Sequence, residues 1–159
     1  MLKNGQKFPE LKLQAVGGGA IDLPGDLAGS FGVVLIYRGA WCPVCNNQLA
    51  DFAASKSELD ALGVKVVALS VDDQATGAAL VQKHNLAFPV GHSADADQTA
   101  AVIGAYTNDK PPYLQPTDFI LAPDGSILNA VYSSNAMGRI APAEVKMLVS
   151  YIKAQAKAA

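Results

Sequence analysis

The stretch from Phe31 to Phe52, FGVVLIYRGAWCPVCNNQLADF, contains both cysteines of the chain and the change of pattern that decides its fold. Its first part, FGVVLIYR, is a short apolar and β-branched run, which predicts a buried strand. From Pro43 the apolar residues recur at spacings of three and four, as at Cys45, Leu49 and Phe52, which predicts a helix with one buried face. The cysteines therefore lie where a strand ends and a helix begins.

The rest of the chain continues this alternation. The helix that begins at Pro43 is expected to end at Gly63, and VKVVALSV (64–71) predicts a second buried strand. The other expected elements are an N-terminal hairpin that turns at 16–20, a helix that closes at Asn85, a helix within 95–106, a hairpin over 118–132 and a helix over 141–158. Strand, helix, strand predicts a parallel βαβ unit.

This order of elements, with a CxxC motif at the end of the first buried strand, resembles the thioredoxin fold. We therefore expect an α/β protein with a central mixed sheet, helices on both faces and an N-terminal β-hairpin extension. The 159 residues fit one such domain, 1–159, because domains commonly contain about 100–200 residues.

Composition and charge exclude several classes of function. Half of the residues are hydrophobic, the formal net charge is −2, and the charged residues are scattered, so we expect neither a nucleic-acid nor a membrane partner. The N-terminus lacks an apolar signal segment, and a cytoplasmic location is expected. In that compartment a lone CxxC pair is more often catalytic or metal-binding than a structural disulfide.

The place of the two cysteines predicts different roles for them. A free thiol is only a few per cent thiolate at neutral pH, and a helix N-terminus stabilises the anion. Cys42 occupies the expected N-cap, and Pro43 the first helical position, where its missing N–H costs nothing. We therefore assign Cys42 as the nucleophile. Cys45 lies one turn further on the apolar face, so we expect it to be more buried and to act as the resolving thiol. Trp41 is either a contact surface for a partner or simple packing.

Two alternatives compete with a redox pair. A zinc site needs about four ligands, and besides the cysteines the chain offers only His84, expected at a helix end, and His92, expected in a loop. The cysteines could also be unrelated buried residues, although that would not explain their place at a strand-to-helix junction.

Several stretches together resemble the redoxins, the branch of the thioredoxin superfamily that includes the peroxiredoxins (alkyl hydroperoxide reductase and thiol-specific antioxidant family). They are GQKFPELKLQ (5–14), VVLIYRGAWCPVCNNQLADF (33–52), VVALSVDD (66–73) and PTDFILAPDGSIL (116–128). The resemblance implies that Cys42 is the attacking cysteine and that Cys45 is the resolving cysteine of thioredoxins. It also implies that Pro116, which precedes Thr117 at the start of a strand, is the cis-proline that faces the CxxC motif in thioredoxins.

The chain also departs from these families. Peroxiredoxins carry a threonine or serine three residues before the attacking cysteine and a proline seven before it, where this chain has Gly39 and Leu35. Their helper arginine is replaced by Pro116, which leaves Arg38 and Arg139 as candidate cations near the thiolate, and Arg38 is preferred because it is near Cys42 in sequence. Thioredoxins often have a buried acid six residues before the first cysteine, where this chain has an isoleucine.

The leading hypothesis is an antioxidant enzyme that cycles Cys42 and Cys45 between dithiol and disulfide while it reduces hydroperoxides. The alternatives are a thioredoxin-like protein thiol-disulfide oxidoreductase, and a redox sensor or zinc-binding module without turnover. No organic cofactor is expected, because the electrons travel through sulfur. An external thiol reductant, such as a thioredoxin or glutathione system, must restore the dithiol.

Overall fold

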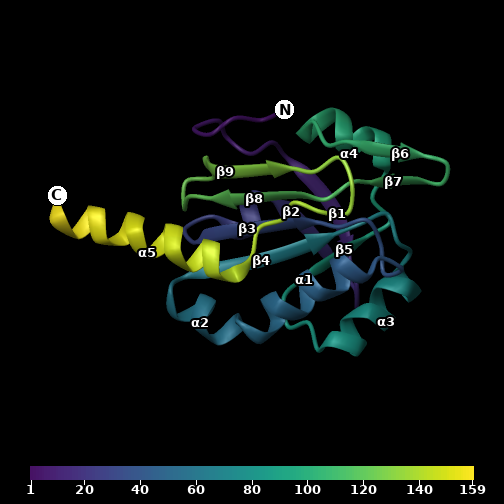
Figure 1. Ribbon diagram of the computed structural model, residues 1–159, viewed down its shortest axis with the longest axis horizontal. Coiled ribbons are helices and arrows are strands. Elements are labelled where there is room, and N and C mark those ends of the chain that lie inside the picture. Colours follow the sequence, from purple (N-terminus) through teal and green to yellow (C-terminus); the bar gives the residue numbers. More distant parts are fainter.

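A mixed sheet of seven strands forms the centre of the computed structural model, which describes all 159 residues (Figure 1). The order across the sheet is β2-β1-β5-β4-β3-β8-β9. The strands are β1 (Leu11–Ala15), β2 (Ala20–Leu23), β3 (Phe31–Ile36), β4 (Val64–Leu69), β5 (Val90–His92), β8 (Thr117–Leu121) and β9 (Ile127–Tyr132), and β6 (Thr107–Asp109) and β7 (Pro112–Leu114) form a separate hairpin. The helices are η1 (Gly25–Leu27), α1 (Pro43–Ala54), α2 (Lys56–Ala61), α3 (Gln74–His84), α4 (Ala96–Ile103) and α5 (Pro142–Ala158).

The central strand β3 pairs in parallel with β4 and antiparallel with β8, so it is buried from both sides. Successive side chains of a strand point to opposite faces, which divides the interior into two apolar clusters. One cluster packs Val33 and Leu35 of β3 against α1, α2, α3 and α5, and the other packs Val34 and Ile36 against α4, η1 and the N-terminal hairpin. Helices therefore cover both faces of a thioredoxin-like α/β sheet, as expected, and the N-terminal hairpin β1–β2 is confirmed.

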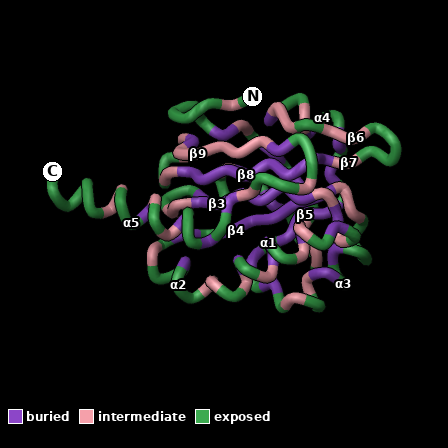
Figure 2. Tube along the Cα trace, in the orientation of Figure 1, coloured by how far each residue is buried: buried purple, intermediate pink, exposed green.

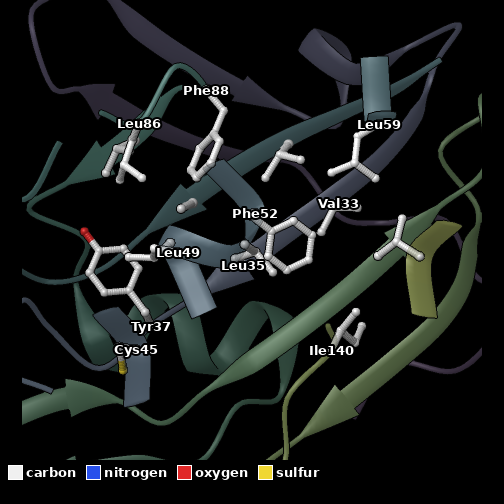
Figure 3. Packing of buried hydrophobic residues seen from close by; sticks show 14 of the residues in the cluster. Val33, Leu35, Tyr37, Cys45, Leu49, Phe52, Leu59, Leu86, Phe88 and Ile140 are labelled. Carbon is white, nitrogen blue, oxygen red and sulfur yellow. The ribbon is translucent and has the colours of Figure 1, made fainter. Parts of the chain in front are cut away.

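Burial follows this arrangement. The central strands are buried, whereas the far end of α5 extends away from the body and is exposed (Figure 2). Cys45 lies at one end of the first cluster, next to Tyr37, and Phe52 lies deeper in it (Figure 3). None of the helices combines the length and the apolar character that crossing a bilayer would require.

Two sequence expectations were wrong in detail. The helix predicted from Pro43 to Gly63 is two helices, because the backbone at Ser55 (φ −95°, ψ 5°) leaves the helical conformation before α2 begins. Serine favours helix ends because its side chain competes for backbone groups. His92, expected in a loop, lies in the short buried strand β5. The segment around Pro112 forms the hairpin β6–β7.

Candidate active site

The two cysteines lie at the N-terminus of α1, as predicted. Cys42 is the N-cap, with φ −90° and ψ 114°, and its Sγ accepts a hydrogen bond from the backbone N–H of Cys45 at 3.3 Å, while Pro43 is the first helical residue. The sulfur atoms of the two free cysteines are 2.6 Å apart. Cys45 is therefore within direct reach of a group formed on Cys42. Both side chains are 0% exposed within the first apolar cluster, so solvent exposure does not distinguish them.

The cation nearest the sulfurs is Arg139, not the preferred Arg38. The Nη2 group of Arg139 donates to Cys45 Sγ at 3.0 Å and approaches Cys42 Sγ at 3.8 Å. Arg38 contributes its backbone N–H to Cys45 Sγ at 3.4 Å, while its guanidinium lies over Trp41 and donates to the Tyr113 hydroxyl at 2.9 Å. Arg38 also acts on the site, because a hydrogen bond from its side chain helps to lower the pKa of Cys42, but the direct contacts with both sulfurs come from Arg139.

The surroundings shift the pKa values of the two thiols in opposite directions. Burial raises the pKa of Cys42, but hydrogen bonds from the Cys45 thiol and backbone, the charge of Arg139 and a hydrogen bond from the Arg38 side chain outweigh it, so the pKa is lowered. Burial and the hydrogen bond to Cys42 raise the pKa of Cys45, against the opposing effects of the Arg38 N–H and Arg139. Cys42 is thus the thiol that ionises first, which matches a nucleophile.

Aromatic residues form a rim beside the cysteines. Trp41 is 56% exposed, its ring meets that of Tyr113 edge to face at 5.1 Å, and the Arg38 guanidinium lies 4.8 Å and 5.2 Å from the two ring centroids. The indole also covers Gly39, where a Cβ atom would lie 2.3 Å from Trp41 Nε1. Any larger residue at position 39 requires the indole to move.

Polar contacts hold the backbone around Cys42. The Asp72 carboxylate, which follows β4, accepts the Ala40 N–H at 2.8 Å, and Asn46 donates to the carbonyls of Ala40 and Cys42 at 2.9 Å and 2.8 Å. His84, at the end of α3, pairs with Asn46 at 2.7 Å. His84 thus supports the site indirectly, which the sequence analysis missed. No group of three or more His, Cys, Asp or Glu side chains that could hold a metal ion is present.

A buried polar network behind the cysteines was also missed. Asp118 pairs with Leu35 in the sheet, so its side chain points to the face covered by α1. There Asp118 Oδ2 accepts a hydrogen bond from Gln48 Nε2 at 2.8 Å, and Gln48 Oε1 accepts one from Arg139 Nη1 at 2.8 Å. Two features of the sequence could have indicated this network: an acidic residue inside an apolar strand and a glutamine on the apolar face of α1. Burial raises the pKa of Asp118 to about 6, against the opposing effect of its hydrogen bonds.

Comparison with known proteins decides the family. The family model described as "AhpC/TSA family" matches residues 4–130, which is most of the chain. The chain belongs to the AhpC/TSA family. A peroxiredoxin of Methanothermobacter thermautotrophicus is 27% identical over 153 residues, which cover 92% of this chain and 72% of that protein. The thiol-disulfide oxidoreductase ResA of Bacillus cereus is 27% identical over 128 residues, covering 80% of this chain and 68% of the relative.

The fold agrees with this family. The crystal structure of a mutant of peroxiredoxin 6 from Arenicola marina superposes with a TM-score of 0.83 at 18% identity, and the match covers 98% of this chain and 76% of that one. As an AhpC/TSA protein the chain is a peroxiredoxin-like, thiol-dependent peroxidase, which confirms the class of enzyme expected from the sequence.

The remaining predicted residues, Pro116 and Thr117, lie at the start of β8. Both are buried, and Thr117 pairs with Ile36 at the end of β3. The cis peptide bonds of the chain precede Pro24 and Pro111, so the bond before Pro116 is trans, contrary to the thioredoxin resemblance. The trans isomer is the one that an X–Pro bond favours intrinsically.

Proposed function

We propose that this AhpC/TSA protein reduces hydroperoxides with Cys42 as the attacking thiol and Cys45 as the resolving thiol. The observation that carries the proposal is the N-cap position of Cys42, whose sulfur accepts an N–H bond, has a lowered pKa and lies 2.6 Å from Cys45 Sγ. A small oxidant suits this site because both sulfurs are buried.

The cycle has three steps. The Cys42 thiolate attacks the terminal oxygen of a hydroperoxide, the O–O bond breaks, and the departing alkoxide takes a proton to become an alcohol, or water when the oxidant is hydrogen peroxide. Cys45 then attacks the sulfur of the Cys42 sulfenic acid, a disulfide forms, and the hydroxyl group leaves as water with the proton of Cys45. An external dithiol, or two thiol molecules, finally reduces the disulfide by supplying two electrons and two protons, and is itself oxidised to a disulfide.

The reductant must come from outside the chain, because the two cysteines supply only one pair of electrons. We propose a dithiol or glutathione system of the cytoplasm, a compartment that keeps such donors reduced. Trp41, half exposed beside the sulfurs, offers an apolar contact for that donor. Residues 1–159 would act as one domain in this cycle.

Stopped-flow oxidation of the fully reduced protein by hydrogen peroxide tests the proposal. We expect thiol loss far faster than for a free thiol of the same pKa, no fast phase in Cys42→Ser, and an unchanged first phase in Cys45→Ser that stops at a sulfenic acid. The sulfenic acid is detected by mass spectrometry after trapping with a dimedone reagent. Equal loss of the first phase in both variants would contradict the assigned roles.

A second candidate substrate is a protein disulfide. It is favoured by the exposed Trp41 next to a CxxC pair and by Gly39, which cannot supply the hydroxyl that peroxiredoxins place there. Reduction of insulin disulfides by the dithiol form, measured beside the peroxide reaction, distinguishes the two. A peroxide rate no better than that of a free thiol, together with insulin reduction, would replace the first candidate by the second.

A further inference from the structure

A buried carboxylate that does not touch either sulfur is linked to Cys45 through two other side chains. Asp118 is 1% exposed, and its Oδ2 atom accepts two hydrogen bonds, from Gln48 Nε2 at 2.8 Å and from the backbone N–H of Ile140 at 2.9 Å. Its other oxygen, Oδ1, has no partner. A buried carboxylate with one oxygen that lacks a hydrogen-bond partner lowers the stability of the fold. Its presence behind the active site therefore calls for an explanation.

The contact with Asp118 fixes the orientation of the Gln48 side-chain amide. Its Nε2 group donates to Asp118 and to the Ile140 carbonyl at 3.0 Å, and its Oε1 accepts from Arg139 Nη1 at 2.8 Å. A carboxylate only accepts hydrogen bonds, so the NH₂ group of Gln48 must face Asp118 and the oxygen must face Arg139. Asp118 thus sets which end of the amide meets the guanidinium.

All three nitrogen atoms of the Arg139 guanidinium donate hydrogen bonds. Nε donates to the Ala136 carbonyl at 2.7 Å, Nη1 donates to Gln48, and Nη2 donates to Cys45 Sγ at 3.0 Å. The next residue is held as well, since the N–H of Ile140 is bound by Asp118 and its carbonyl by Gln48. The side chain and the adjoining backbone of Arg139 therefore depend on the same pair of residues.

We propose that Asp118 is a positioning residue for the resolving step: through Gln48 and the Ile140 backbone it holds Arg139 on the Cys45 sulfur. There the guanidinium stabilises the Cys45 thiolate as it attacks the Cys42 sulfenic acid, while the proton of Cys45 leaves with the hydroxyl group as water. This inference rests on the proposed function. The charged groups that face Asp118 are Arg139, from the segment after β9, and Glu144, from the first turn of α5.

The test is the pKa of Cys45, measured by thiolate absorbance and alkylation rate in the Cys42→Ser protein, where it is the only thiol. Asp118→Leu removes the acceptor at similar volume, so we expect Arg139 to loosen and the pKa of Cys45 to rise by about one unit, a tenfold loss of thiolate at a given pH. Asp118→Asn keeps an acceptor oxygen and should restore a pKa close to that of the parent protein.

The sign of the change separates positioning from a direct effect of charge. If the Asp118 charge acted on Cys45 directly, both Asp118→Leu and Asp118→Asn would lower the pKa of Cys45, and that result would overturn the proposal. In an Arg139→Gln protein the pKa of Cys45 should already be raised, and Asp118→Leu should add nothing to it. An additive effect would also overturn the proposal. The matched control is Asp51→Asn, which removes an exposed carboxylate from α1, the helix that carries Cys45. It should leave the pKa of Cys45 unchanged.

A second variant tests the same proposal if Asp118→Leu fails to fold. Gln48→Met has a similar shape and removes the link to Arg139 but leaves the bond from Ile140 N–H to Asp118. It should raise the pKa of Cys45 in the same direction, and an unchanged value would refute the positioning role. No peroxide or reductant enters these titrations, so a lack of peroxide turnover would count against the proposed function alone.

Discussion

Replacing Asp118 by asparagine should make the stability of the protein less dependent on pH. Burial raises the pKa of Asp118 from its ordinary value of 3.8 to about 6. Because the folded state holds the proton more tightly than the unfolded chain does, the contribution of Asp118 is fully present below pH 3.8 and is lost as pH rises through 6. The difference of about 2.2 pKa units corresponds to about 3 kcal/mol of lost unfolding free energy.

Urea denaturation of both reduced proteins between pH 4 and pH 7, followed by circular dichroism, measures this effect. Asparagine does not titrate, so the unfolding free energy of Asp118→Asn should rise relative to that of the wild type by about 2.4 kcal/mol between pH 4 and pH 7, since part of the full effect already lies below pH 4. Other titrating groups are common to both proteins and cancel in the difference.

The pH profile of the exposed control Asp51→Asn should run parallel to that of the wild type. Replacing an exposed surface carboxylate usually changes the unfolding free energy by no more than about 0.5 kcal/mol. Parallel profiles for the wild type and Asp118→Asn would refute the reasoning. They would mean that the hydrogen bonds from Gln48 and Ile140 fully compensate the burial of the charge.

Further predictions concern the rim, the core and the thiols. Gly39→Ala should displace the indole of Trp41, because the new Cβ would lie 2.3 Å from Nε1, and an unchanged tryptophan emission maximum would argue against this contact. Phe52→Ala should cost about 3–5 kcal/mol of unfolding free energy in urea, since Phe52 is fully buried, and a loss below about 1 kcal/mol would show that the core closes around the gap. Iodoacetamide should alkylate Cys42 at lower pH than Cys45, as followed by peptide mass spectrometry, and coincident pH profiles would contradict the opposite pKa shifts.

Long segments with a clear period were predictable from the sequence. The apolar runs became β3 and β4, and the hairpin around Gly125 became β8 and β9 with the expected turn. The strand β5 was missed because its three residues, Val90–His92, are too few to show alternation, and its pairing depends on distant partners in β1 and β4. The break at Ser55 was missed because the apolar spacing continues across it to Leu59.

The part of the site within one segment was also predictable, whereas the part assembled from distant segments was not. The N-cap position of Cys42 follows from local rules, because Pro43 marks the first turn of α1. The position of Arg139 depends on a loop without any periodic pattern and on contacts to residues more than 90 positions away. Asp118 could be found as an acid within an apolar run, but its link to α1 becomes visible only through the pairing of β3 with β8.

The two sulfurs are also part of the apolar interior, since both belong to the same cluster as Phe52 and Val149. Oxidation of Cys42 beyond the sulfenic acid would create a sulfinate, a permanent anion, in a place that excludes water. Damage by excess oxidant would then appear as unfolding and loss of the protein as well as loss of turnover. In the proposed cycle, rapid closure of the disulfide by Cys45 would therefore protect the fold itself, and the lifetime of the protein under oxidative stress would depend on how fast Cys45 reacts.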